Sequence, residues 1–334
     1  MIHARLAALA LLIAGAPLAA QDKPAEPPTP ASVVAASRPD EWKAIDPADL
    51  LVMELAPDAR GARQQVIVQL IPPPFSQGWV GNVRALAKAY WWDGTSVYRV
   101  VDNWVAQWGD GEDDPNKAKP LPAGMKPVPE SEYSAPMPCK VYLFEKKVLK
   151  EECNPAVTAL EPVDPYDLKG QAGFAAGWPV AFALGSDGNR VWPTHCYGSV
   201  GVARNLSPDT GTGAELYAVI GHAPRQLDRN IAVVGRVIEG IESLSTLPRG
   251  KGENGVYDDA KLRVPIVSVR LGSELPAAEQ PRFEYLASDS PSFTDYVHVR
   301  ANRNDAFFKV PAGGVDVCNV QVPIRRVGAK AAVR

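Results

Sequence analysis

A series of short β-type runs, separated by turns rich in glycine, proline and aspartate, limits how this chain can fold more than any other feature. Runs of four to eight residues that alternate apolar and polar side chains, or are apolar throughout, are typical of strands. The runs are LLVMEL, QQVIVQL and GTSVYRVVDNWVAQWGD in the first third, and GSVGVAR, AELYAVIG, IAVVGRVIEG and PIVSVRL further on. Many short antiparallel-type strands predict a mainly β fold, built as a closed or nearly closed barrel.

Only two segments among these runs have the character of a helix. Five residues at helical spacing predict a helix over 79–90, and IEGIESLSTLP predicts a second, shorter one. The stripe consists of Val80, Val83, Leu86, Ala87 and Tyr90. The chain also contains 32 prolines in 334 residues, about twice the usual share of roughly 5%, which argues against a helical protein.

Composition divides the chain into a discontinuous barrel with additions. We predict a signal peptide at 1–20, a Pro/Ala-rich linker at 21–47, the barrel at 48–110 and 193–273, an insertion at 111–192, and a C-terminal extension packed on the barrel at 274–334. Within the insertion we expect a hairpin near its centre, followed by irregular structure that ends in a short strand. Within the extension we expect a helix over 291–308 and one more strand.

The N-terminus has the three parts of an export signal. Arg5 supplies a short positive region, Leu6 to Ala16 an apolar one, and small residues precede a cleavage site that we place after Ala20. The alternative, an uncleaved anchor, is disfavoured because the apolar stretch is shorter than the roughly 20 residues that span a bilayer. We therefore predict a periplasmic or secreted protein with no stable membrane insertion after signal removal.

Export makes the four cysteines candidates for two disulfides, because exported proteins meet an oxidising environment. Three connectivities are open. Cys139 and Cys153 flank KVYLFEKKVLKEE, which reads as two strands and a charged turn, so we favour a local hairpin bridge that leaves Cys196 to pair with Cys318. Free buried thiols are the alternative. The spacing of His and Cys residues does not suggest zinc, so we predict neither metal nor cofactor.

The charges of the chain are balanced. Its 35 basic and 38 acidic residues leave a formal net charge of −3, and no basic block or stripe stands out. Proteins that bind nucleic acid usually carry such a patch. We therefore predict no nucleic-acid partner.

One run, GTSVYRVVDNWVAQWGD at 94–110, places polar side chains where apolar ones are expected. Arg99 and Gln107 interrupt a pattern of valines and tryptophans that is otherwise typical of a strand. From periodicity alone, Arg99 reads as a surface arginine on a half-exposed strand.

Four stretches that include this run resemble the cyclophilin-type peptidyl-prolyl cis-trans isomerases. The segment GNVRALAKAYWWDGTSVYRVV resembles the family's helix and the strand with its Phe-His-Arg-Val motif, and NWVAQWGD resembles Phe-Met-x-Gln-Gly-Gly-Asp. The segment GSVGVARNLSPDTGTGAELYAVIGHAPRQLD resembles the family's Met-Ala-x-Ala segment, its Gly-Ser-Gln-Phe-Phe-Ile strand and the Leu-Asp that follows. VVGRVIEGIESLSTLP resembles Phe-Gly-Arg-Val-x-x-Gly. Within the family, the chain resembles secreted bacterial members.

The resemblance implies a closed eight-stranded antiparallel barrel, capped by two helices, with a groove on its outer wall. It implies that Arg99 is the catalytic arginine and that the substrate is a proline-containing polypeptide. It also implies which residues line the substrate site: Gln107, Trp104, Val105, Glu215, Tyr217 and Leu227. A fixed donor such as Arg99 could hydrogen-bond to the prolyl nitrogen in a twisted amide, which needs no metal, acid or nucleophile.

The chain departs from the family's pattern at several of these positions. Glu215 stands for a glutamine, Val105 for a methionine, Gln226 for a tryptophan, Ile231 for a histidine and Tyr98 for another histidine. A catalytically weak binding or chaperone module for Pro-containing segments is therefore a second hypothesis, and a structural envelope protein is a third. An open apolar groove beside Arg99 would favour catalysis, whereas an insertion folded over the groove would favour a structural role.

Overall fold

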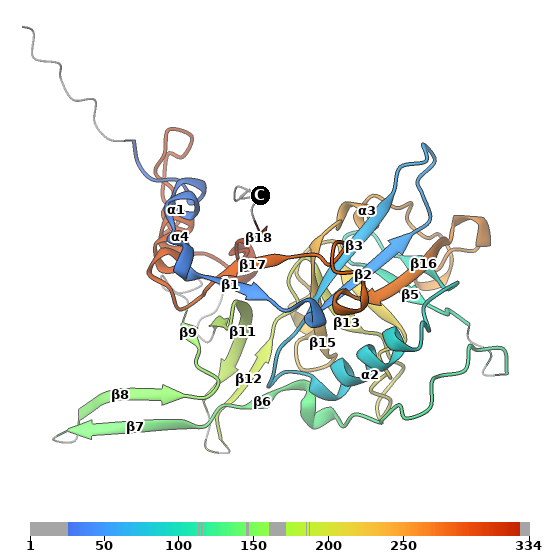
Figure 1. Ribbon diagram of the computed structural model, residues 1–334. Helices are drawn as coiled ribbons and strands as arrows, with labels where there is room; N and C mark the ends of the chain where they lie inside the picture. Colours follow the sequence, from blue (N-terminus) through green and yellow to red (C-terminus); the bar gives the residue numbers. More distant parts are fainter. Residues whose placement is uncertain are drawn as a thin grey trace, which may run out of the picture.

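The computed structural model describes residues 26–112, 114, 116–144, 147–159, 172–184, 186 and 188–327. Its largest element is a closed barrel with the strand order β13-β14-β5-β4-β16-β2-β3-β15, in which every neighbouring pair is antiparallel (Figure 1). The strands are β2 (Leu50–Leu55), β3 (Gln64–Leu70), β4 (Ser96–Val100), β5 (Val105–Gly109), β13 (Ser199–Val202), β14 (Leu216–Val219), β15 (Val233–Glu239) and β16 (Val264–Leu271). The predicted eight-stranded antiparallel barrel is thus confirmed, and all its strands lie within 48–110 and 193–273.

Strand β3 has apolar side chains on both faces of the barrel wall. Val66, Val68 and Leu70 belong to the barrel core, whereas Ile67 belongs to a second cluster with Leu50 and residues outside the barrel. Because successive side chains of a strand point to opposite faces, Ile67 faces outward. The outer face of β2 and β3 is therefore covered by other parts of the chain rather than by water.

Two helices accompany the barrel: the first has the predicted length but begins and ends two residues earlier, and the second is shorter than predicted. The first, α2 (Gln77–Lys88), buries Trp79, Val83 and Leu86 against the core. It stops before Tyr90, which has a left-handed backbone (φ 53°) and is 55% exposed, so its place in the apolar stripe was a coincidence of spacing. The second, α3 (Glu242–Ser245), is a single turn, because the residues predicted to begin it continue β15 as far as Glu239.

The insertion contains a regular sheet where irregular structure was predicted. Residues Ala176 and Gly177 both adopt positive φ and join two strands tightly, although Ala176 gives no turn signal in the sequence. The predicted hairpin is present as β7 and β8. The elements are η3 (Glu130–Tyr133), β6 (Ala135–Pro136), β7 (Cys139–Phe144), β8 (Lys147–Cys153), β9 (Thr158–Ala159), β10 (Ala172–Ala175), β11 (Trp178–Ala183) and β12 (Arg190–Pro193), with sheet order β6-β12-β11-β10-β9.

The segment predicted as a linker at 21–47 is not a linker where the structure describes it. From residue 26 on, it forms α1 (Pro30–Ala36) and β1 (Trp42–Ile45), and β1 pairs with β17 (Phe283–Leu286) of the C-terminal extension. The partners lie at opposite ends of the chain, so nothing local reveals the pairing. Residues 1–25, with the predicted signal peptide, lie outside the described residues.

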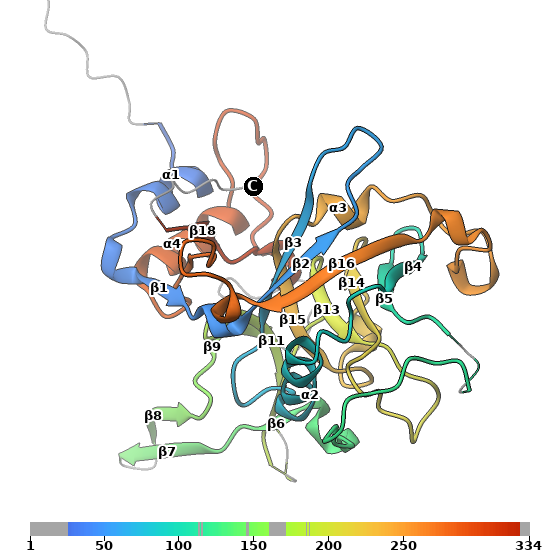
Figure 2. The same cartoon turned by 45° about the vertical axis from the view of Figure 1, so that its right-hand side comes forward.

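Both ends of the chain therefore build a second lobe beside the barrel (Figures 1 and 2). Strand β17 also pairs with β18 (Ile324–Arg326), and α1 packs on α4 (Pro291–Ala301), which ends before the predicted residue 308. Val34, Trp42 and Phe293 form one apolar cluster with Phe174 of β10, so the lobe packs on the inserted sheet as well as on the barrel. No helix of the described part is long and apolar enough to cross a membrane.

Short 3₁₀ turns join these elements. They are η1 (Pro39–Glu41), η2 (Pro47–Asp49), η4 (Arg225–Leu227), η5 (Glu253–Gly255), η6 (Ala260–Leu262), η7 (Gly272–Glu274) and η8 (Val317–Asn319). Two of them matter below, because η4 and η5 lie beside the candidate site.

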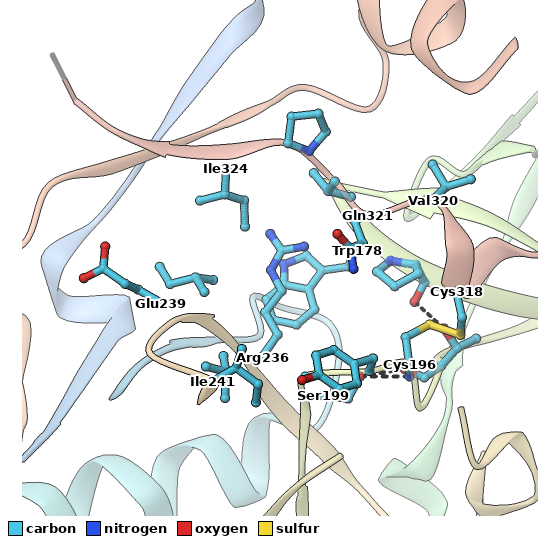
Figure 3. Close-up of a pocket in the computed structure, with 18 of the residues that line it drawn as sticks. Trp178, Cys196, Ser199, Arg236, Glu239, Ile241, Cys318, Val320, Gln321 and Ile324 are labelled. Carbon is cyan, nitrogen blue, oxygen red and sulfur yellow. Dashed lines mark hydrogen bonds between the residues drawn. A yellow bond between two sulfur atoms is a disulfide. The ribbon is translucent and has the colours of Figure 1, made fainter. Parts of the chain in front are cut away.

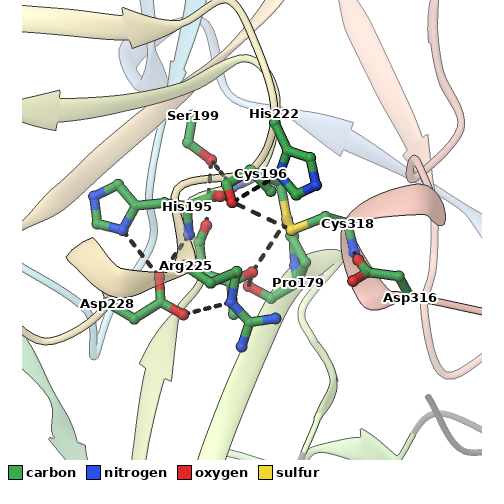
Figure 4. The surroundings of a disulfide bond; sticks show 11 residues. Pro179, His195, Cys196, Ser199, His222, Arg225, Asp228, Asp316 and Cys318 are labelled. Atoms are coloured by element: carbon green, nitrogen blue, oxygen red, sulfur yellow. Dashed lines mark hydrogen bonds and ion pairs between the residues drawn. A yellow bond between two sulfur atoms is a disulfide. The ribbon is translucent and has the colours of Figure 1, made fainter. Parts of the chain in front are cut away.

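A disulfide between Cys196 and Cys318 ties the second lobe to the barrel across 122 residues of chain (Figure 4). This pairing was predicted and is confirmed. Cys139 stands opposite Cys153 in the register of β7 and β8. The side chain of Cys139 lies outside the described residues, so that bridge stays a prediction.

Glu41 links the N-terminal segment to α4 and makes stability depend on pH. Its carboxylate accepts hydrogen bonds from the Arg38 N–H (2.8 Å), the Ser292 N–H (3.1 Å) and the Ser292 hydroxyl (2.7 Å). These bonds, the one from Arg38 first, hold the pKa of Glu41 below its usual 4.5. A depressed acid stabilises the fold above its unfolded pKa, and the contribution is lost as the pH falls through the folded value.

We therefore expect acidification below pH 4.5 to weaken the fold, and Glu41→Gln to lose part of that dependence. Urea unfolding of both proteins between about pH 3 and 7 would measure this, since the slope of stability against pH counts the protons taken up. Identical pH profiles would contradict the assignment to Glu41.

Candidate active site

Three polar side chains form one row across three neighbouring strands of the barrel wall. Arg99 of β4 stands opposite Gln107 of β5, and Gln107 stands opposite Tyr217 of β14. Residues directly opposite one another on antiparallel strands share a face of the sheet. Their neighbours Val100, Ala106 and Ala218 belong to the barrel core, so the row lies on the outer wall.

An apolar cluster separate from the barrel core lies beside this row. Val105, Tyr217 and Val219 are buried in it, and Trp104 and Leu227 pack against them while keeping part of their surface exposed. Val105 and Val219 are opposite each other, two residues along from Gln107 and Tyr217. The structure thus brings together Trp104, Val105, Tyr217 and Leu227, as the sequence resemblance implied.

Arg99 lies between this cluster and solvent and is held by neutral groups. Its Nη1–H donates to Oε1 of Gln107 (2.8 Å) and its Nε–H to the carbonyl of Asn254 in η5 (2.6 Å). The guanidinium carbon is 5.5 Å from the centre of the Trp104 ring. Desolvation lowers the pKa of Arg99. Within the described part of the chain no carboxylate forms an ion pair with Arg99, which leaves its charge and its Nη2 donors available to a ligand.

A second contact fixes the orientation of Gln107. Its Nε2–H donates to the hydroxyl of Tyr98, so the amide cannot rotate without losing a partner on each side. Burial, and after it the nearby carboxylate of Glu215, raises the pKa of Tyr98, which keeps the phenol neutral. Tyr98 stands at the position of the family's histidine, and its hydroxyl holds the Gln107 amide in place.

Glu215 does not join the apolar cluster. Its Oε1 accepts the N–H of Asp110 (2.8 Å), and the carboxylate lies over Gly109, where an added Cβ would come within 2.1 Å of Oε2. Burial raises the pKa of this carboxyl, whose Oε2 has no hydrogen-bond partner among the described residues. Gln226, at the family's tryptophan position, is exposed on η4. Glu215 and Gln226 therefore leave the hydrogen bond between Arg99 and Gln107 intact, but they reduce the apolar surface beside it.

Sequence reasoning missed a buried chain of hydrogen bonds behind the cluster. His195 is fully buried, with Nε2 3.0 Å from the Tyr217 hydroxyl and Nδ1 3.0 Å from Oδ1 of Asp228. Asp228 also accepts the Nε–H of Arg225 (2.6 Å), as Figure 4 shows. Because a carboxylate only accepts, Nδ1 donates a proton to Asp228, and Nε2 is the ring's contact with the Tyr217 hydroxyl. No spacing in the sequence connects residue 195 with 217 and 228.

Removing the Tyr217 hydroxyl tests how much these hydrogen bonds contribute to stability. We expect Tyr217→Phe to lower the free energy of unfolding by about 1–3 kcal/mol, because Nε2 of His195 is left buried without a partner. The phenyl ring still fills the cluster, so KM for a proline peptide should change little. Gln226→Ala, an exposed change on the neighbouring turn, should stay within about 0.5 kcal/mol of wild type. Denaturant titration decides, and equal stability of Tyr217→Phe and wild type would refute the assignment.

A closed antiparallel barrel with an arginine beside an apolar cluster on its outer wall is the arrangement that the sequence resemblance implied. A family model described as cyclophilin type peptidyl-prolyl cis-trans isomerase/CLD matches residues 78–271, more than half of the chain. The chain therefore belongs to the cyclophilin-type peptidyl-prolyl cis-trans isomerases and is an enzyme of that kind.

A solved cyclophilin structure shares the fold. The crystal structure of cyclophilin AquaCyp293 from Hirschia baltica superposes with a TM-score of 0.58 at 22% identity, over 84% of this chain and 95% of its own. That coverage exceeds the barrel, so the likeness in fold includes part of the additions. A cyclophilin-type isomerase from Cryptosporidium parvum, solved in the presence of the dipeptide Ala-Pro, reaches only 0.34 at 12% identity, over 66% of this chain and 98% of its own. No curated protein sequence matches the chain.

Proposed function

We propose that the chain isomerises X–Pro bonds of exported polypeptides and that Arg99 stabilises the twisted amide of the transition state. The observation that carries the proposal is the orientation of Arg99. Two neutral acceptors, on Gln107 and Asn254, hold its guanidinium beside the apolar cluster, and no carboxylate of the described residues neutralises it. A proline ring placed on Trp104 and Leu227 would bring its nitrogen within reach of the unused Nη2 donors.

Energetics favour such a mechanism. The partial double bond of the amide sets a barrier of about 18–20 kcal/mol. Twisting the amide localises the lone pair on nitrogen, so a donor aimed there binds the transition state more strongly than the planar ground state. One preorganised donor contributes about 3–4 kcal/mol, which corresponds to a rate factor of roughly 10²–10³.

A second candidate function is binding of Pro-containing segments with little turnover. Val105 and the exposed Gln226 offer less apolar surface than the large residues that the family has there. A fully buried large apolar side chain is worth about 1.5–3 kcal/mol, so the loss of contact at two positions lowers affinity for the ring. The structural role is less favoured, because the apolar cluster includes no described residue of 111–192. The hairpin of that insertion projects away from β4 and β5 in both views (Figures 1 and 2).

The location of the substrates follows from the predicted signal at 1–20. The disulfide between Cys196 and Cys318 supports an oxidising compartment, since disulfides persist there and are rare in the cytosol. We therefore propose a periplasmic or secreted isomerase.

NMR exchange between the cis and trans forms of an Ala-Pro peptide tests the proposal directly. Uncatalysed exchange takes on the order of tens to hundreds of seconds, so catalytic amounts of the mature protein should produce exchange cross-peaks that are absent without it. If the resonances of several X–Pro peptides shift without faster exchange, the protein binds proline-containing segments but does not isomerise them. The absence of both effects would leave only the structural role.

A further inference from the structure

A cavity of about 390 Å³ lies where the barrel, the inserted sheet and the second lobe meet (Figure 3), and its lining includes none of Arg99, Gln107 and Tyr217. Its walls come from β15, from the start of β11, from the segment before β13 and from residues 317–326 of the extension. The volume is within the range of about 300–1,000 Å³ that small-molecule sites occupy. Much of the wall is apolar, with Ile241, Phe283, Val320 and Ile324 among its residues.

Arg236 of β15 points into this cavity without a carboxylate partner. Its Nε–H and Nη2–H donate to Oε1 of Gln69 (2.9 and 2.8 Å), and its Nη1–H donates to the carbonyl of Gly177 (2.7 Å). All three bonds use neutral acceptors. Desolvation lowers the pKa of Arg236 to about 9, yet part of its surface remains accessible from the cavity. A buried guanidinium is costly unless an anion pairs with it.

Trp178 supports Arg236 in the same wall. Its ring lies under Arg236, with 4.3 Å from the guanidinium carbon to the ring centre, as Figure 3 shows. The indole N–H is buried and has no hydrogen-bond partner among the described residues. That nitrogen has almost no accessible surface, so of the two residues only Arg236 offers donors to the cavity.

The other charged groups of the lining already have partners. Arg326 forms an ion pair with Glu239, and Arg325 forms one with Glu284 (2.6 Å). The cavity therefore has one net positive charge, and that charge belongs to Arg236.

We propose that this cavity binds a small organic carboxylate whose acid group pairs with Arg236, and whose apolar body lies against the aliphatic and aromatic wall. A planar fork of guanidinium donors matches a carboxylate well. The apolar wall selects against acetate or inorganic ions, which have no body to bury. The site is distinct from the groove, so the inference does not rest on the proposed isomerase mechanism.

Calorimetric titration of the full chain with three probes tests the assignment. Hexanoate has both the charge and the apolar body, 1-hexanol lacks the charge, and acetate lacks the body. We expect hexanoate to bind one site per chain at least tenfold more tightly than either of the others. Arg236→Gln should remove the preference for hexanoate over hexanol, whereas Arg99→Ala, which removes an arginine from the groove, should leave it unchanged.

The outcome does not depend on the folding of one variant. If Arg236→Gln fails to fold, the hexanoate-to-hexanol ratio of the wild type still decides, because a wall without a free charge would bind the two six-carbon probes alike. Equal affinity for the two six-carbon probes, binding of neither, or an unchanged preference in Arg236→Gln would overturn the proposal. In that case Arg236 serves only to join β15 to Gln69 and Gly177. Competition between hexanoate and an Ala-Pro peptide would also contradict a separate site.

Discussion

Arg99→Ala is expected to lower kcat/KM for an Ala-Pro peptide by about 10²–10³-fold, because one preorganised donor to the developing lone pair is lost. The loss should fall mainly on kcat, since a donor that acts in the twisted state adds little to ground-state binding. The fold should survive, because Arg99 lies on the outer wall and the barrel core does not depend on it.

A matched pair of variants separates charge from geometry. Arg99→Lys keeps the positive charge but lacks the planar fork that donates to Gln107 and Asn254 at once, so most of the activity should still be lost. Gln107→Ala keeps the arginine but removes one of its two anchors, and an intermediate loss is expected. Exchange NMR measures all three proteins. Wild-type rates in Arg99→Ala would transfer the catalytic role to another residue.

Removal of the Cys196–Cys318 disulfide is expected to lower the free energy of unfolding by about 2–5 kcal/mol. The bond closes 122 residues of chain, and long loops gain the most from cross-linking in the chain-entropy account. A loss of this size is a large part of the roughly 5–15 kcal/mol that stabilises an ordinary domain. It should be greatest for the second lobe, because Cys318 lies in the extension and Cys196 next to the barrel.

Denaturant titration of Cys196→Ser/Cys318→Ser measures the effect. Cys318→Ser alone should give nearly the same loss of stability, since either change breaks this one bond. A reductant that breaks this bridge should destabilise the wild type, whereas the double variant has no such bridge to lose. Unchanged stability of the double variant would show that packing alone holds the extension to the barrel.

The barrel could be predicted because its signals are local. Alternation in QQVIVQL and its counterparts gives each strand two faces, and a strand needs only its own residues to show this pattern. The row of Arg99, Gln107 and Tyr217 could be anticipated only through the resemblance to a family. Periodicity alone read Arg99 as an ordinary surface arginine.

The second lobe could not be predicted because its pairing is not local. The Pro/Ala-rich composition of 21–47 is typical of a linker, and only burial of Trp42 and Val34 against residues of the extension turns it into a folded element. Likewise, Ala176 takes a left-handed turn because β10 and β11 pair around it, not because of its own preference.

The sequence by itself determined the β-rich pattern of the barrel and, through the resemblance to a family, the eight strands and the identities of Arg99, Gln107, Trp104 and Tyr217 in the candidate site. Only the tertiary structure decided that His195 and Asp228 support Tyr217, that Glu215 turns away toward Gly109, and that Arg236 faces a cavity without a carboxylate. The physical reason is that hydrogen bonds and buried charges depend on which side chains meet in space. Strand pattern depends only on neighbours along the chain.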